Sequence, residues 1–511
     1  MKTNAAAAWL IMPPRLDTAQ NDRRSGRGEK RGGSPVRSLV VALSWLVLFW
    51  CWALYPTKAE VNGIAPGVPE PKGRQVIVQL FNWPFSKITE VLPELRRLGY
   101  SHVHVSPPQQ SNERVLTWWG RYQPVDFSFI KGPLGTEEEF RQMNAAADQL
   151  DIKIIADAVL NHTIDLTDVP EGSVTFNAAT GEMTSYDFPL FQPSDFHPRC
   201  PIDDNDSNSV TKCWLDNRNA DLKTETTRVR DIARTYLKKL VALGVDGFRF
   251  DAAKHIEPDF FADVLAAVPN TFAFGEVIES NPQKFPQTEA IAFYDFPLVA
   301  TMKEAFGFGG DLDVLRNPAG QNRALPGSKA VTFVRNHDID RGQARDRGLH
   351  EGAQSTYGIG WNGPERELTE ADILLAYAYI FGREGGVPYV FVDMEPTTAG
   401  DKRKDRFNDE RVVAFIRFHN LCLDEQEGGP RPEEPVNLGS ENAIAWQRGK
   451  DRLVMINKSG EKLPLRNLQT TLKPGSYVEV HEGWVLEVQS DGTIGDWELP
   501  AQTAAMFVRQ G

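Results

Sequence analysis

The stretch whose residues most clearly suggest catalytic chemistry is Gly247-Phe-Arg-Phe-Asp251, an apolar run that ends in an acid. This pattern predicts a buried strand, and because side chains alternate along a strand, Arg249 and Asp251 should lie on the same face. A neighbouring guanidinium lowers the pKa of a carboxyl, so we expect Arg249 to keep Asp251 ionised at neutral pH. A positioned, ionised carboxylate can act as a covalent nucleophile. Lys254 and His255 follow within four residues.

Three other predicted strands also end in polar side chains. A single acidic strand end could be a structural ion pair. Four such ends on one rim of a barrel of parallel strands indicate an active site, because catalytic residues gather at that rim. The three further endings are Asp157-Ala-Val-Leu-Asn161-His162, Gly275-Glu276 and Asn336-His337-Asp338.

Asp251 and Glu276 follow consecutive strands, so their carboxyls can approach the ~5–5.5 Å separation found in retaining glycoside hydrolases. We predict that Asp251 is the nucleophile. Glu276 follows the apolar run Phe272–Gly275, which should raise its pKa and make it the proton donor and later the base. Asp338 is predicted to stabilise positive charge on the sugar in the transition state. Further predicted substrate contacts are His162, Arg249 and His337.

The loop after the second predicted strand contains three aromatic residues within Thr117–Pro124. Exposed aromatic rings need an apolar partner, and the faces of sugar rings are apolar. We therefore predict that Trp118, Trp119 and Tyr122 stack on substrate. The alternative is that they pack into the core beneath the loop.

Eight apolar segments between residues 75 and 392 are predicted strands, each followed by a helix or a helix-like segment. Repeated βα units of this number predict a closed (β/α)8 TIM barrel. The predicted strands are Gln75–Phe81, His102–Ser106, Ile152–Leu160, Gly247–Asp251, Thr271–Val277, Ala290–Tyr294, Ala330–Arg335 and Val387–Val392. The predicted helices are 88–98, 138–150, 226–243, 259–267, 370–381 and 411–423.

Two regions depart from this alternation. Residues 163–222 are polar and rich in Asp, Pro, Thr and Asn, which predicts a domain inserted after the third strand. After the last helix, short alternating apolar runs predict a small antiparallel β domain. We therefore divide the chain into an N-terminal region (1–59), a barrel (73–162 and 223–423), an insertion (163–222) and a C-terminal β domain (424–511).

The N-terminal region differs from the rest in charge. It carries a net charge of +6, and the total of −13 leaves −19 for residues 60–511. An acidic body argues against a nucleic-acid partner and favours a neutral ligand. Basic residues precede an apolar segment at 39–55, which predicts export by a signal peptide cleaved near Thr57-Lys58-Ala59, or by a retained membrane anchor. The protein is then secreted, or anchored with its catalytic domain outside the cytoplasm, and we expect a monomer.

An exported chain permits disulfides. Cys200 and Cys213 bracket a polar loop, and we predict a disulfide that closes this loop, with two free thiols as the alternative. Neither the cysteine spacing nor nearby histidines support a zinc site.

Segments 157–162, 247–255, 275–277 and 333–338 resemble, in order and spacing, the four motif regions of the alpha-amylase family, glycoside hydrolase family 13. The resemblance covers residues 74–511 and is strongest to the animal-type branch and its bacterial relatives. It implies a (β/α)8 barrel, an inserted domain B after strand 3 and a C-terminal antiparallel β-sandwich. It also implies retaining endo-hydrolysis of α-1,4-glucosidic bonds in starch, glycogen and related glucans, with Asp251, Glu276 and Asp338 in the roles given above.

The resemblance also implies further contacts. Lys254 and His255 match residues that bind sugar units past the cleaved bond. The family's calcium site matches Asn161, Asp221 and the backbone carbonyl of His255, although the segment from Cys213 to Asp221 is one residue longer than the family pattern. Some relatives bind an activating chloride through a basic residue in the last barrel strand. Tyr389 stands at that position, so chloride dependence is doubtful.

Other functions are compatible with parts of this pattern. A maltogenic or transglycosylating enzyme acting on maltooligosaccharides would share the same motifs. Non-catalytic membrane glycoproteins, such as the heavy subunits of amino-acid transporters, resemble the layout of tail, apolar segment and family-13-like domain, but lack the catalytic residues and most of domain B. The three predicted catalytic acids and the insertion of about 60 residues favour an enzyme over such a protein or over a starch-binding protein without turnover.

Overall fold

The computed structural model describes residues 63–341, 368–394, 406–423 and 432–510, all of which belong to one compact unit, Val61–Gly511. The predicted N-terminal region, with the apolar segment 39–55 and the expected cleavage site, lies outside the described residues. Among the helices that the structure describes, none is long and apolar enough to cross a membrane.

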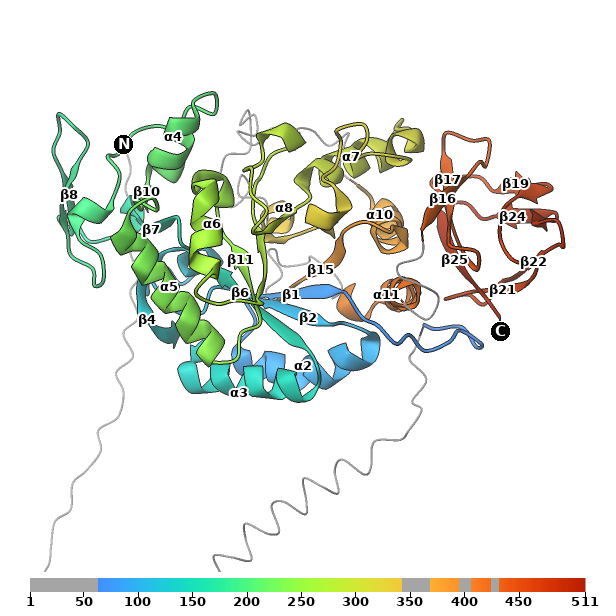
Figure 1. The fold of residues 1–511 in the computed structure, drawn as a ribbon, viewed down its shortest axis with the longest axis horizontal. Helices are drawn as coiled ribbons and strands as arrows, with labels where there is room; N and C mark the ends of the chain where they lie inside the picture. The colour runs from blue at the N-terminus through green and yellow to red at the C-terminus, as the bar shows by residue number, and fades with distance from the viewer. Residues whose placement is uncertain (1–62, 342–367, 395–405, 424–431, 511) are drawn as a thin grey trace, which may run out of the picture. The chain divides into compact units, whose positions relative to one another are not determined.

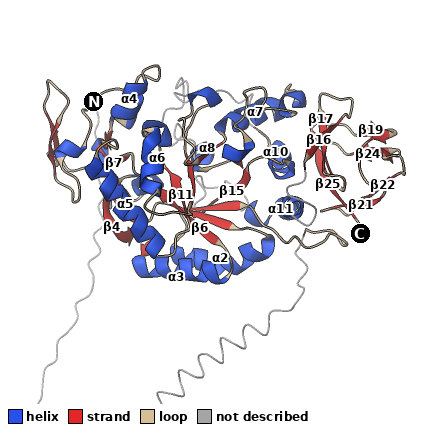
Figure 2. Ribbon diagram, in the orientation of Figure 1, coloured by secondary structure: helices blue, strands red, loops and turns tan. Residues whose placement is uncertain are grey.

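Eight parallel strands close into a barrel, which confirms the predicted fold (Figures 1 and 2). Around the barrel the order is β1-β15-β14-β13-β12-β11-β6-β2, so the strands that carry Asp157, Asp251 and Glu276 are neighbours. The strands are β1 (Ile77–Phe81), β2 (His102–Val105), β6 (Lys153–Ala158), β11 (Gly247–Phe250), β12 (Phe272–Gly275), β13 (Ala292–Tyr294), β14 (Ala330–Phe333) and β15 (Val387–Asp393).

The barrel strands are buried on both faces, as parallel strands covered by helices must be. Every residue of β1, β11 and β14 is buried. Aromatic side chains of four strands pack together, with ring centroids between 4.9 and 6.4 Å apart. They are Phe274, Tyr294, Phe333 and Tyr389. This packed core fixes the strand ends that carry the polar residues.

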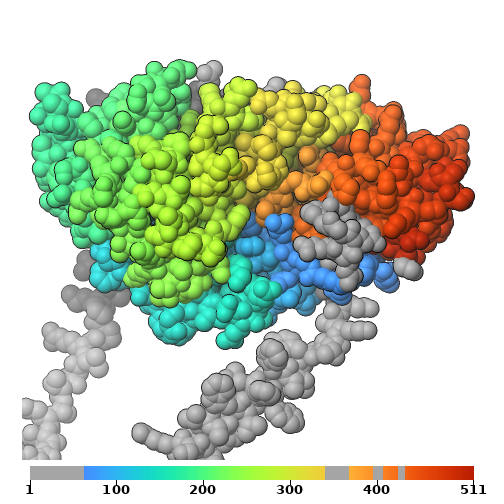
Figure 3. All heavy atoms as spheres, in the orientation of Figure 1, coloured from blue at the N-terminus to red at the C-terminus, as the bar shows by residue number. Residues whose placement is uncertain are grey.

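Helices surround the barrel strands, and the side chains of α3, α5 and α6 form the outer surface on the face shown in Figure 3. Capping boxes at Thr136 and Thr369 define the first turns of α3 and α10. The α-helices outside the insertion are α2 (Phe85–Leu98), α3 (Glu137–Gln149), α5 (Thr227–Ala242), α6 (Pro258–Leu265), α7 (Phe296–Phe306), α8 (His337–Arg341), α10 (Glu370–Gly382) and α11 (Glu410–Cys422).

One βα unit differs from the predicted repeat. Between β12 and β13 the chain forms only the short 3-10 helix η6 (Pro282–Lys284). Pro282 and Pro286 explain this, because proline starts a helix readily but disfavours helical backbone in the residue before it.

The chain between β6 and α5 forms two small antiparallel pairs, one short α-helix and three 3-10 helices. β7 (His162–Asp165) pairs with β10 (Asn219–Asp221), and β8 (Val174–Phe176) pairs with β9 (Met183–Tyr186). The helix α4 (Ser207–Lys212) lies in the loop between Cys200 and Cys213, which form the predicted disulfide. The limits of 163–222 for a separate inserted domain stay a prediction.

The C-terminal part is an antiparallel sheet, as predicted, with the order β16-β17-β18-β25-β21-β22-β23-β20 and a separate pair β19-β24. The indole Nε1 of Trp446 donates a hydrogen bond of 2.9 Å to the carbonyl of Gly382 at the end of α10, which ties the sheet to the barrel helices. The strands are β16 (Glu433–Val436), β17 (Ala443–Arg448), β18 (Arg452–Asn457), β19 (Leu463–Leu465), β20 (Leu468–Gln469), β21 (Gly475–Glu479), β22 (Val485–Val488), β23 (Thr493–Ile494), β24 (Trp497–Leu499) and β25 (Thr503–Arg509).

Candidate active site

Three acids from three strand ends line one cavity of about 100 Å³. Asp251 follows β11, Glu276 follows β12, and Asp338 lies in α8, which follows β14. The structure therefore brings together the three predicted catalytic residues. The predicted substrate contacts that also line this cavity are Trp118, Trp119, Tyr122, His162, Lys254, His255 and His337.

Arg249 is fully buried and connects acids from three adjacent strands. Its Nη1 donates hydrogen bonds to Asp157 Oδ1 at 2.7 Å and to Asp251 Oδ1 at 2.8 Å, and its Nη2 donates to Glu276 Oε1. The strand register produces this arrangement, because Arg249 in β11 lies opposite Asp157 in β6 and Phe274 in β12. One guanidinium thus fixes the relative positions of the predicted nucleophile and the predicted proton donor.

The single charge of Arg249 cannot neutralise all three acids. Burial opposes ionisation of Asp157, but Arg249 and His104 outweigh burial and lower the pKa of Asp157 to about 2. For Asp251, burial and the charges of Glu276 and Asp157 outweigh Arg249 and raise the pKa to about 8. Arg249 thus favours the ionised form of Asp251 as predicted, but less than expected, because Asp157 and Glu276 share the same guanidinium.

The pKa of Glu276 is raised to about 8, as predicted for a proton donor. Burial is the main cause, Arg249 opposes it, and the nearby Asp338 adds to it. Because Asp251 and Glu276 are close and both buried, they titrate as a pair. Asp338 raises the pKa of Glu276 and so favours protonation of Glu276 within the pair.

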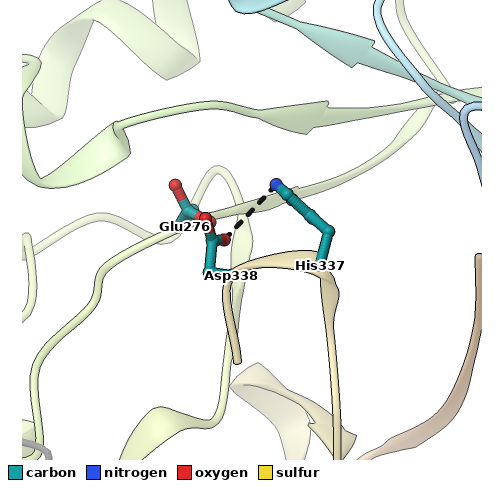
Figure 4. A group of neighbouring side chains, drawn as sticks. All are labelled: Glu276, His337 and Asp338. Carbon is teal, nitrogen blue, oxygen red and sulfur yellow. Dashed lines mark ion pairs between the residues drawn. The ribbon is translucent and has the colours of Figure 1, made fainter. Parts of the chain in front are cut away.

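His337 joins Asp338 to the aromatic wall of the cavity. Figure 4 shows Glu276, His337 and Asp338 pointing toward one another, with His337 Nε2 3.3 Å from Asp338 Oδ2. The His337 ring stacks between Phe81 and Tyr122, with centroid distances of 4.6 and 5.3 Å. The ligand atoms of Glu276, His337 and Asp338 lie within 4.8 Å of one another and are close enough to hold a metal ion, but this is not the predicted calcium set.

The aromatic loop forms the 3-10 helix η1 (Trp118–Tyr122). Trp118 is only 7% exposed and contacts Phe81 edge-on at 5.7 Å, so most of its ring packs into the core, as the alternative interpretation held. Trp119 and Tyr122 are half-buried, which leaves part of each ring open to a ligand. The Tyr122 hydroxyl donates to Asp157 Oδ2 at 3.0 Å.

His162 and His255 are buried at the cavity and are held by backbone carbonyls. His162 Nε2 lies 3.1 Å from the Tyr122 carbonyl, and His255 Nδ1 lies 2.9 Å from the Val210 carbonyl. Burial lowers the pKa of each imidazole to about 4, so both rings are neutral at pH 7. A neutral imidazole can donate or accept a hydrogen bond to a sugar hydroxyl.

Two of the three residues predicted to bind calcium lie in direct contact. Asn161 Nδ2 donates to Asp221 Oδ1 at 3.1 Å, and both side chains are buried. Asn161 Oδ1 is buried without a hydrogen-bond partner. Burial raises the pKa of Asp221 to about 7, although His197 opposes this effect. A buried carboxylate beside an amide oxygen that lacks a donor fits the oxygen ligands that Ca²⁺ prefers.

The contacts of three residues at or near the site were not predicted from sequence. Asp157 was expected only as a polar strand end, yet its Oδ1 accepts a hydrogen bond of 2.7 Å from Arg249. The pairing of β6 with β11 would have indicated it. Tyr389 is hydrogen-bonded to His104 at 2.8 Å and to Tyr294 at 2.6 Å. The contact of Lys254 with Asp204 had no sequence signal, because 50 residues separate the two.

Comparison with known proteins places this site in a family. Residues 85–290 match the family model "Alpha amylase, catalytic domain". An alpha-amylase of Aeromonas hydrophila is 30% identical over 459 residues, covering 80% of this chain and 92% of the relative. An alpha-amylase of Tenebrio molitor is 30% identical over 465 residues, covering 83% and 93%. The crystal structure of alpha-amylase I from Eisenia fetida shares the fold, with a TM-score of 0.68 at 23% identity, covering 87% of this chain and 99% of that structure.

The chain belongs to the alpha-amylase family, and the family identified from the four sequence motifs is confirmed. It is a glycoside hydrolase of the alpha-amylase type, built on a TIM barrel with a C-terminal β domain.

Proposed function

We propose that this protein hydrolyses α-1,4-glucosidic bonds within starch, glycogen and related glucans, with retention of the anomeric configuration. The observation that carries the proposal is the attachment of Asp251 and Glu276, at the ends of neighbouring strands, to the same buried Arg249. Two carboxyls at adjacent strand ends suit a double-displacement mechanism, in which one acid attacks the sugar and the other transfers protons.

In the first step, an Asp251 oxygen attacks the anomeric carbon while the bond from that carbon to the glycosidic oxygen breaks. Glu276 gives its proton to the departing oxygen, so the leaving chain departs with a neutral hydroxyl. The raised pKa of Glu276 supplies the protonated acid. The products of this step are a glycosyl ester on Asp251 and the ionised Glu276.

In the second step, the Glu276 carboxylate removes a proton from a water molecule that attacks the same carbon. The ester bond breaks and Asp251 leaves as a carboxylate. Two inversions at one carbon restore the original configuration. Glu276 ends the cycle protonated, ready for the next bond.

Asp338 stabilises the positive charge that develops on the sugar ring in both steps. His337 lies against Asp338 and, like the neutral His162, reaches sugar hydroxyls in the cavity. Trp119 and Tyr122 offer ring faces to the apolar faces of the sugars. Lys254 and His255, at the same cavity, bind sugar units on the leaving-group side.

Asn161, Asp221 and the carbonyl of His255 would hold calcium. The bound ion would supply a fixed positive charge between the insertion and the barrel, with no part in bond cleavage. Chloride is not required in this proposal, because Tyr389 is already hydrogen-bonded to His104 and Tyr294. We also propose that the protein is a monomer that is secreted, or held at the membrane by residues 39–55 with its catalytic domain outside the cytoplasm.

The test is to incubate the purified protein with soluble starch and with maltotriose, and to follow the new anomeric protons by NMR. Rapid release of oligosaccharides in the α form from starch is expected. Activity restricted to short oligosaccharides, or transfer to other sugars instead of water, would favour the alternative family-13 activity. Products in the β form would overturn the retaining mechanism.

A further inference from the structure

Lys254, at the wall of the catalytic cavity, is bound by an acid from the disulfide-closed loop. Its Nζ donates a hydrogen bond of 2.8 Å to Asp204 Oδ1. The Lys254 side chain is 14% exposed and that of Asp204 is 44% exposed. Asp204 lies between Cys200 and Cys213, which form the disulfide. A loop of the insertion therefore contacts a residue just three positions after the predicted nucleophile.

The same loop makes a second contact at this point. The carbonyl of Val210, in α4, lies 2.9 Å from His255 Nδ1. The loop also has an ordered internal structure: Ser209 Oγ donates to the carbonyl of Asp203 at 2.8 Å, and Asp206 caps α4 by accepting from Asn208 N. Asp204 is thus held by a short, cross-linked segment that is attached beside Lys254.

A second acid lies near Lys254. Glu279 Oε2 is 4.0 Å from Lys254 Nζ, beyond hydrogen-bond distance, and 3.4 Å from Lys284 Nζ. Lys254 therefore makes its close contact with Asp204 and only a longer-range contact with Glu279. An ammonium has three N–H donors, so one bond to Asp204 leaves two for other acceptors.

We propose that Asp204 is a positioning residue that fixes the Lys254 ammonium at the cavity wall and thereby strengthens binding of sugar units on the leaving-group side. This inference rests on the proposed function, in which Lys254 contacts those units. A lysine side chain loses several rotatable degrees of freedom on binding, and prior attachment to Asp204 removes part of that cost before the glucan arrives. The effect belongs to substrate binding rather than to the chemical step.

The experiment compares Asp204→Asn with Asp203→Asn in the full-length protein. Both substitutions remove one negative charge from adjacent positions of the same loop, but only Asp204 contacts Lys254. For maltoheptaose, Asp204→Asn should raise KM about twofold to fivefold, the range for a partly exposed ion pair, with kcat unchanged. Asp203→Asn should leave KM unchanged. Asp204→Glu, which restores the charge, should recover part of the lost affinity.

Two further measurements separate positioning from a general structural role. With 4-nitrophenyl maltotrioside cleaved at the aryl bond, no sugar occupies the leaving-group side, so Asp204→Asn should not change KM. In a Lys254→Met background, Asp204→Asn should have no further effect on maltoheptaose. The inference would be overturned if Asp204→Asn and Asp203→Asn gave equal KM values. It would also be overturned if Asp204→Asn raised KM as much in the Lys254→Met background as in the unmodified protein. An unmodified protein without glucan hydrolysis would instead reject the proposed function.

Discussion

Two clusters of acids in this protein differ in the cation that accompanies them. Around Arg249, acids of three barrel strands share a guanidinium whose pKa is raised well above its ordinary value by Asp157 and its neighbours, although burial opposes this. Around His197, Asp221 Oδ2 lies 2.7 Å from Nδ1 and Glu225 Oε1 lies 3.2 Å from Nε2. The first cation is permanent, whereas the second can lose its proton.

The two clusters also differ in how completely their oxygens are satisfied. Both Asp157 oxygens accept hydrogen bonds, one from Arg249 and one from Tyr122. Beside Asp221, the amide oxygen of Asn161 is buried without a donor. A permanently charged cation keeps the acids around it in fixed positions, whereas a buried oxygen that lacks a donor leaves room for another cation. We therefore propose that the first cluster carries the chemistry and that the second binds calcium.

The largest effect should come from the two acids on Arg249 that face the cavity. We expect Asp251→Asn and Glu276→Gln each to lower kcat on starch by about a thousandfold or more, because one removes the nucleophile and the other the proton donor. Thermal unfolding should show that both variants remain folded. A variant of either kind that retains a tenth of the activity would contradict the mechanism.

The permanent cation itself should matter for stability as well as for rate. Arg249→Met leaves the buried, ionised Asp157 without its permanent counter-charge, and we expect a loss of about 3–5 kcal/mol in the free energy of unfolding at pH 7, measured by denaturant titration. The loss should shrink as the pH falls, because protonated acids no longer need the guanidinium.

The matched control is Arg141→Met. Arg141 makes an ion pair with Glu138 on the exposed surface of α3, where both side chains are more than half exposed. Loss of this pair should not shift the unfolding midpoint. If both variants behave alike, the Arg249 cluster does not stabilise the fold in the way argued.

The second cluster should respond to chelation. If calcium binds at Asn161 and Asp221, its removal by EDTA should lower the Tm, since an ion present at a hundredfold excess over its Kd stabilises the folded state by about 2.7 kcal/mol. In Asp221→Asn, EDTA should shift the Tm much less. An unmodified protein whose Tm does not respond to EDTA would remove the calcium proposal and leave His197 as the counter-charge of Asp221.

Features that depend on local patterns could be predicted from sequence, and features that depend on register or on distant contacts could not. The eight strands, the acids at their ends and the disulfide follow from apolar runs, polar endings and a bracketed loop. By contrast, the raised pKa of Asp251 depends on its burial and on the alignment of β11 with β6 and β12, which makes Asp157 and Glu276 compete for Arg249. The burial of Trp118 depends on Phe81 and His337, which lie far away in the chain.

The smallest effect concerns the proton on Glu276. Catalysis needs this group protonated, and its pKa is raised to about 8. Above that pH, kcat/KM on maltoheptaose should therefore fall about tenfold per pH unit.

Asp338 contributes to the raised pKa of Glu276 through its negative charge. Asp338→Asn removes that charge. It should move the alkaline limb of the pH profile of kcat/KM to lower pH by about one unit or less, whatever it does to the maximal rate. Asp203→Asn removes a charge outside the cavity lining and should leave the limb in place. A limb that does not move in Asp338→Asn would mean that Asp338 does not contribute to the raised pKa of Glu276, which burial and the charges around Arg249 would then set without α8.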